Sequence, residues 1–131
     1  MNNFLESLKK VNTFSAGEPV TEAQIEKAEF ELDLFFANDY KLCLMNFGQV
    51  SAKNVELTSI INVKWLDVVK TTKEARERFM LPDKYYVLED LHFDGALAVQ
   101  EASGKVYIFH KGTLTEHSDS LLEYVITNSS K

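Results

Sequence analysis

The sequence predicts an α+β fold in which helices pack on a single antiparallel β-sheet. Three observations support this prediction. Apolar residues recur at helical spacing in the first third of the chain, strand-like segments fill most of the remainder, and a short turn joins two of those segments. Helices and strands segregated in this way are typical of α+β proteins. At 131 residues the chain is expected to form one domain over residues 1–131.

Three helices are expected before any strand. The first carries Phe4, Leu8 and Val11 at helical spacing. The second begins at Thr21, because Thr21 and Gln24 form a Thr-x-x-Gln capping box. Its apolar stripe is Ile25, Ala28 and Leu32, and its acidic solvent face is Glu22, Glu26 and Glu29. The third contains Tyr40, Cys43, Leu44 and Phe47 and ends at Gly48.

From Val55 the apolar period changes to two, which predicts a strand or hairpin whose buried face continues to Trp65. A charged surface helix follows over residues 68–79. The next strands are expected at residues 85–89, 96–100 and 106–110, as an antiparallel meander with a turn at Ser103-Gly104. Ser118 or Ser120 then caps a terminal helix that contains Leu121, Leu122, Val125 and Ile126.

The net charge of −6 and the sequence pI near 5.0 disfavour phosphate backbones and anionic lipids, so neither nucleic acid nor a membrane is an expected partner. Residues 1–50 and 81–131 each carry eight acidic against four basic residues. If the fold clusters these acids, they would steer a basic protein partner; a merely soluble surface is the alternative. No pattern predicts an oligomeric state.

A cytoplasmic location is expected. The first residues lack the pattern of a signal peptide, and no apolar run approaches the roughly 20 residues that span a bilayer. Cys43 is the single cysteine, so no internal disulfide can form, and its apolar neighbours predict a buried thiol.

No catalytic or cofactor-binding motif is present: the five glycines stand far apart, and serine-hydrolase, Cys-x-x-Cys and His-Glu-x-x-His patterns are lacking. We therefore expect a protein that binds another protein, without a cofactor. The one constellation to weigh is the acidic segment at residues 89–94. Asp90, His92 and Asp94 would share a face of an extended backbone and could hold a divalent metal. Alternatively, Glu89, Asp90 and Asp94 form a docking site for a basic partner, or the segment is a solvated loop.

Two segments carry a resemblance to a known family: the helix from Val20 to Leu32, and Phe36-Ala37-Asn38-Asp39-Tyr40 with the ending Leu42 to Gly48. They resemble the SUKH superfamily, which contains many bacterial toxin-immunity proteins and the fungal cell-wall-assembly regulators. Ala37 stands where proline is usual and Phe36 where leucine is usual, so the third helix is expected to begin less sharply. Weaker similarity continues to the terminal helix.

The resemblance implies an α+β fold and direct neutralisation of a cognate toxin, often a nuclease, inside the cell. It supplies no active-site residue. The alternative that it implies is a scaffold or regulatory module like the fungal relatives.

Overall fold

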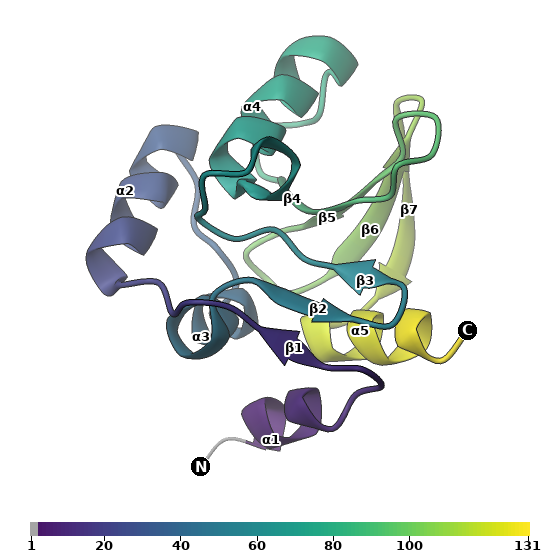
Figure 1. Cartoon of the computed structure of the whole chain (residues 1–131). Helices are drawn as coiled ribbons and strands as arrows, with labels where there is room; N and C mark the ends of the chain where they lie inside the picture. Colours follow the sequence, from purple (N-terminus) through teal and green to yellow (C-terminus); the bar gives the residue numbers. More distant parts are fainter. Residues whose placement is uncertain (1–2) are drawn as a thin grey trace.

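A computed structural model gives the structure and describes residues 3–131. Five α-helices, one 3₁₀ helix and seven strands follow one another in these residues (Figure 1). In chain order they are α1 (Asn3–Lys9), β1 (Ser15–Ala16), α2 (Glu22–Leu32), α3 (Asn38–Phe47), β2 (Val50–Ala52), β3 (Val55–Glu56), η1 (Lys64–Leu66), α4 (Val68–Phe79), β4 (Tyr86–Asp90), β5 (Leu97–Gln100), β6 (Val106–His110), β7 (Thr113–Ser118) and α5 (Leu121–Ser129).

The strands form two antiparallel sheets. The first has the order β1-β2-β3 and the second is a meander, β4-β5-β6-β7. The α+β class is therefore confirmed, but the prediction of a single sheet is wrong. The strands of the small sheet have two or three residues each, too few to show an alternating pattern. Strand β7 was missed because its residues, Thr113 to Ser118, are mostly polar.

The predicted strand through Trp65 is also wrong. Regular pairing ends at Glu56, and after a single bridge at Ser59 the chain bends into η1. Trp65 is 49% exposed, so it does not belong to the core. The alternation of apolar residues along this segment is real, but only Val55 and Leu57 point into the protein.

Strands β4 and β5 of the four-stranded sheet are buried on both faces, whereas β7 is mostly exposed. One face, with Tyr86, Leu88 and Val106, packs against α3, α5 and the small sheet. The opposite face, with Val87, Val99 and Phe109, packs against Ala75 of α4 and against Leu81, which follows that helix. Helix α2 lies beside this assembly and contacts α4 (Figure 1). One long side of α2 is consequently left uncovered.

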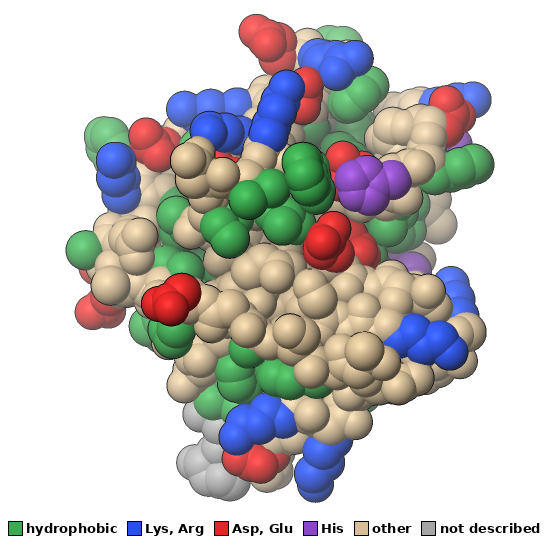
Figure 2. Space-filling model, in the orientation of Figure 1, with side chains coloured by type: hydrophobic (Ala, Val, Ile, Leu, Met, Phe, Trp, Pro, Cys, Tyr) green, Lys and Arg blue, Asp and Glu red, His purple; other side chains and the backbone are tan. Residues whose placement is uncertain are grey.

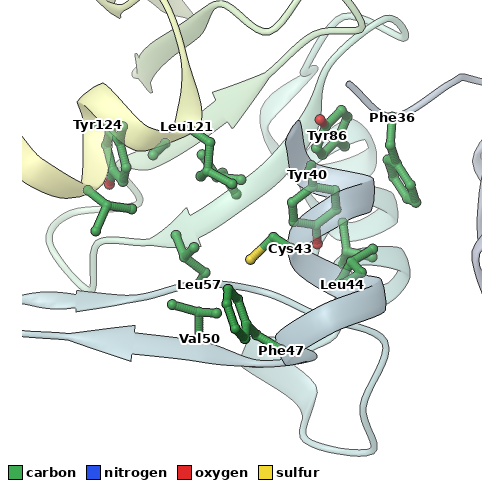
Figure 3. Packing of buried hydrophobic residues seen from close by; sticks show 14 of the residues in the cluster. Phe36, Tyr40, Cys43, Leu44, Phe47, Val50, Leu57, Tyr86, Leu121 and Tyr124 are labelled. Carbon is green, nitrogen blue, oxygen red and sulfur yellow. The ribbon is translucent and has the colours of Figure 1, made fainter. Parts of the chain in front are cut away.

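The motif that begins α3 is built into a buried polar network. Phe36 stacks edge-on against Tyr40 and Tyr86, as Figure 3 shows. The backbone N–H of Ala37 donates to the Tyr86 hydroxyl at 3.0 Å, and that hydroxyl donates in turn to Gln100. The Tyr40 hydroxyl lies 2.9 Å from that of Thr58. A proline at 37 has no N–H, so the departure from the family pattern supplies a donor that this core uses.

The expected ends of α2 and α3 are confirmed. Thr21 and Gln24 make the reciprocal bonds of a capping box. Ala37 starts α3 without a side-chain cap. Gly48 ends it at φ 67°, and a Cβ there would lie 1.8 Å from the carbonyl oxygen of Glu18. Only glycine fits this position.

Candidate functional site

Glu89, the first residue of the predicted acidic docking site, lies inside the protein. Its side chain is 5% exposed. The Tyr124 hydroxyl donates to one carboxylate oxygen, and the backbone N–H of Glu56 donates to the other at 2.7 Å. Glu89 therefore joins β4 to β3 and α5. The prediction that it offers its charge to a partner is wrong, because the fold uses both oxygens.

Burial raises the pKa of Glu89 above its ordinary value, while the two hydrogen bonds act in the opposite direction. The same burial raises the pKa of the Tyr124 phenol, and the neighbouring Glu89 carboxylate raises it further. The pair is thus a buried hydrogen bond from the Tyr124 phenol to the Glu89 carboxyl group. Its role is to hold α5 on the two sheets.

Asp90 is the last residue of β4 and Asp94 lies in the β4–β5 loop; their side chains are partly exposed, at 33% and 54%. One Asp90 oxygen accepts the backbone N–H of His92 at 2.8 Å. One Asp94 oxygen lies 3.2 Å from the His110 ring and 3.2 Å from the Lys111 ammonium. Both acids therefore already interact with groups of the β4–β5 and β6–β7 hairpins.

The loop does not create the metal constellation that its sequence suggested. His92 and Asp94 have left-handed backbone conformations, each with φ 54°, so the segment is not extended and its side chains do not alternate. Asp94 turns to β6, whereas His92 stays beside Asp90, with 3.8 Å between ring and carboxylate. Across residues 3–131, no group of three or more His, Cys, Asp or Glu side chains could hold a metal ion.

Cys43 is not placed for chemistry either. The side chain is 1% exposed and lies in the core beside Tyr40 and Leu44, as Figure 3 shows. Burial raises the pKa of its thiol to about 12, so the thiol stays protonated at neutral pH. The prediction of a buried thiol is confirmed.

A groove beside α2 is the strongest candidate site in the described residues. Three hollows along the open side of α2 share lining residues and so run into one another. The central hollow shares Glu26 and Glu29 with one neighbour, and Asp33 to Phe35 with the other. We call the three together the α2 groove. It runs from Met45 on α3, past Phe30 and Phe35, to Ala102 after β5.

The α2 groove is strongly acidic. Six acidic and two basic residues line it: Glu22, Glu26, Glu29, Asp33, Asp83 and Glu101, with Lys41 and Lys84. Both lysines already lie near acids of the groove, Lys41 at 3.9 Å from Glu29 and Lys84 at 3.4 Å from Glu101. Glu22, Glu26 and Asp33 form no ion pair within residues 3–131. Their charges are available to a basic ligand.

Two aromatic rings stand in this acidic surface without cover. Phe30 is 86% exposed and Phe35 is 73% exposed. Phe30 follows Ala28 by about 200° around the helix axis, which places it opposite the buried stripe of α2. Phe35 comes directly before the buried Phe36 in the connection to α3. The two rings point in different directions, Phe36 into the core and Phe35 outward. Along the left edge of Figure 2, over α2, hydrophobic side chains stand near acidic ones and near Lys or Arg side chains.

Sequence reasoning named neither Phe30 nor Phe35 as a site residue. It treated the outer face of α2 as a solvated acidic surface, which is correct for Glu22 and Glu26. The signal that could have identified the site is a large aromatic residue at a position where the helical period requires a polar one. Glu29 departs from the expectation, because its carboxylate accepts the backbone N–H of Phe36 at 2.8 Å.

Other exposed apolar residues lie in different electrostatic surroundings. Met80 and Phe93 are 83% and 68% exposed at the tip formed by the end of α4 and the β4–β5 loop. At this tip Arg78 pairs with Glu74 and Lys111 pairs with Asp94, so basic residues balance the acids. Figure 2 shows further hydrophobic side chains over the segment between β3 and α4, with a histidine next to them.

The architecture defines the chain as a small α+β domain with an acidic surface groove. A family model, SUKH_5, described as SMI1-KNR4 cell-wall, matches residues 1–127. The chain therefore belongs to the SMI1-KNR4 family of the SUKH superfamily, as the α2 and α3 segments predicted. No curated protein matches the chain. No helix in residues 3–131 has the length and hydropathy to cross a membrane.

Proposed function

We propose that the chain is a non-catalytic immunity protein that binds a cognate toxin in the cytoplasm and blocks it. The observation that carries this proposal is the α2 groove, where unpaired acids surround two uncovered phenylalanines. An apolar centre with a charged rim is the usual composition of a protein-binding surface. Membership of the SUKH superfamily supports the same function.

A basic toxin is the partner that this surface suits. Proteins that act on nucleic acids bind the phosphate backbone with lysine and arginine side chains, and their substrate affinity falls steeply with salt. An acidic protein that covers those side chains competes directly with the substrate. The net charge of −6 also increases the rate of encounter with a positively charged domain.

Co-expression with a toxin whose gene lies beside the gene for this chain tests the proposal. Cells that produce the toxin should grow when the chain is present, and the two proteins should purify together at low salt and less well at moderate salt. An inactive toxin of the same fold controls for general toxicity. Absence of rescue together with absence of a complex would contradict the immunity function.

A second function is favoured by the description of the family itself, which names the cell wall. In this alternative the same groove holds a partner of a regulatory assembly. Expression that is constant and separate from any toxin gene would support it, as would co-purification with cell-wall enzymes in place of a toxin. The two functions use the same surface and differ in the partner.

A further inference from the structure

We infer that the α2 groove is the docking site for a basic amphipathic helix of the protein partner, with Phe30 and Phe35 as its anchors. This inference deepens the proposed binding function and rests on it, because it names the surface and the kind of segment that fits. The occupant presents one apolar stripe flanked by lysine or arginine.

The anchors provide the apolar part of the contact. Interfaces obtain most of their binding free energy from a few central residues, and aromatic side chains are prominent among them. Phe30 and Phe35 both line the central hollow and are both more than two-thirds exposed. Leu34, which is partly buried, lies between them in the lining of the same hollow. An apolar stripe laid over this hollow removes both rings from water.

The rim selects the charge of the partner. Glu22, Glu26 and Asp33 lie along one line of the groove, and each is exposed and unpaired within the described chain. Asp83, near the other end, has a side chain that is 95% exposed and 3.8 Å from Arg76. An acidic or neutral segment would leave the carboxylates of Glu22, Glu26 and Asp33 without partners, whereas lysine and arginine flanking an apolar stripe would meet them.

The walls of the groove favour a helix over a strand. An extended peptide gains affinity by adding to the open edge of a sheet. None of the residues that line the groove lies in a strand, because they belong to α2, α3 and the connections that contain Asp33, Asp83 and Ala102. A helix satisfies its own backbone hydrogen bonds, so it can dock on such walls with its side chains alone.

The tip of the molecule provides a matched control. Met80 and Phe93 are about as exposed as the two anchors, at 83% and 68%, but the charges of this tip are balanced, with Arg78 paired to Glu74 and Lys111 to Asp94. A purely hydrophobic ligand would bind either surface. A basic amphipathic helix should prefer the α2 groove. The double variants Phe30→Ala/Phe35→Ala and Met80→Ala/Phe93→Ala therefore separate charge-guided docking from general stickiness.

A synthetic helix serves as the probe. We would use a fluorescent peptide of about 14 residues, about four turns, with leucines on one face and lysines elsewhere, and measure fluorescence anisotropy against the full chain. The lysine peptide should bind the wild type, and its affinity should fall with salt. The Phe30→Ala/Phe35→Ala variant should bind at least about tenfold more weakly, and the tip variant should bind as the wild type does. A peptide with glutamate in place of lysine should not bind.

Three results would overturn the inference: no binding of the lysine peptide, equal binding by the Phe30→Ala/Phe35→Ala variant, or a loss confined to the tip variant. Urea denaturation of each variant shows that the fold is intact, since all four side chains are exposed. The same variants tested against the toxin distinguish the two proposals. A toxin complex that survives loss of both anchors refutes the docking site alone. Peptide binding without any toxin complex refutes the immunity function alone.

Discussion

Phe35 and Phe36 are neighbours in the chain but belong to opposite sides of the protein. Phe36 is 2% exposed and stacks on Tyr40 and Tyr86, while Phe35 is 73% exposed in the α2 groove. Two acidic residues show the same difference between the inside and the outside of the protein. Glu89 is enclosed by donors from two other elements, whereas Asp33 has no partner in the described chain. The inner side holds the fold together, and the outer side is free to bind.

This contrast shows that acidic residues can have two different roles: some stabilise the fold, and others are available to bind a partner. A carboxylate contributes to recognition only if its charge is not already satisfied by the protein. The density of acids around residues 89–94 is therefore a poor guide, because β3, α5 and β6 supply their partners. The more widely spaced acids of α2 have fewer neighbours to satisfy them.

The largest expected effect is on the inner ring. Phe36→Ala should lower the free energy of unfolding by about 3–5 kcal/mol, because it leaves a cavity between two tyrosines. Phe35→Ala should change it by less than about 0.5 kcal/mol, because that ring is already in water. Urea denaturation of the two variants measures both values. Equal losses would mean that the two rings do not face opposite sides.

Removing the buried charge should have the next largest effect. Glu89→Gln keeps the shape but places an amide nitrogen opposite one of two donors, so it should cost about 1–3 kcal/mol of unfolding free energy. Urea denaturation at neutral pH is the measurement. A loss below the experimental error would show that Glu89 is not enclosed as described.

The same variant has a predicted pH dependence. The pKa of Glu89 is raised in the folded state above its ordinary value of 4.5, so its stabilising contribution is full below that value and is lost as pH rises through the folded pKa. The stability of the wild type relative to Glu89→Gln should therefore decrease from pH 4.5 upward. Denaturation curves across this range test the sign. A relative stability that increases with pH would indicate a lowered pKa.

The acids of the groove should affect binding and not folding. Glu26→Gln with Asp33→Asn should slow association with the toxin by about tenfold at low salt, because steering depends on these charges. The difference should shrink as salt increases. Stopped-flow association rates at several salt concentrations provide the test. A reduced rate that does not respond to salt would exclude the electrostatic cause.

The smallest effect is expected at the tip. Asp94→Asn should change the free energy of unfolding by less than about 1 kcal/mol and leave toxin association unchanged, because its partners His110 and Lys111 are themselves exposed. Paired measurements of stability and association rate with the groove variant make the comparison direct. A larger loss of binding at Asp94 would move the interface to the β4–β5 loop.

Much of the fold could be predicted because helical periods and caps are local. The capping box at Thr21, the stop at Gly48 and the terminal helix all follow from neighbouring residues. The small sheet could not be predicted, since its strands pair Ser15 with Ser51 across two helices and are too short to show a pattern. Trp65 was misplaced because an alternating pattern continued after the pairing had ended.

The site was less accessible to sequence reasoning. Satisfaction of a charge is a tertiary property, so Glu89 and Glu22 look alike in the sequence although one is buried and the other exposed. The groove joins α2 to residues 83–84 and 101–102, which no local pattern connects. Of the features of this site, only the position of Phe30 on the polar side of an amphipathic helix could be recognised from the sequence.

Hydrogen–deuterium exchange of the chain with and without the neighbouring toxin tests the central claim most directly. Binding at the α2 groove predicts slower exchange over residues 22–45 in the complex, with the β4–β5 loop unchanged. Protection confined to residues 90–96, or a complex that protects neither region, would contradict the claim that the acidic groove beside α2 is the binding surface.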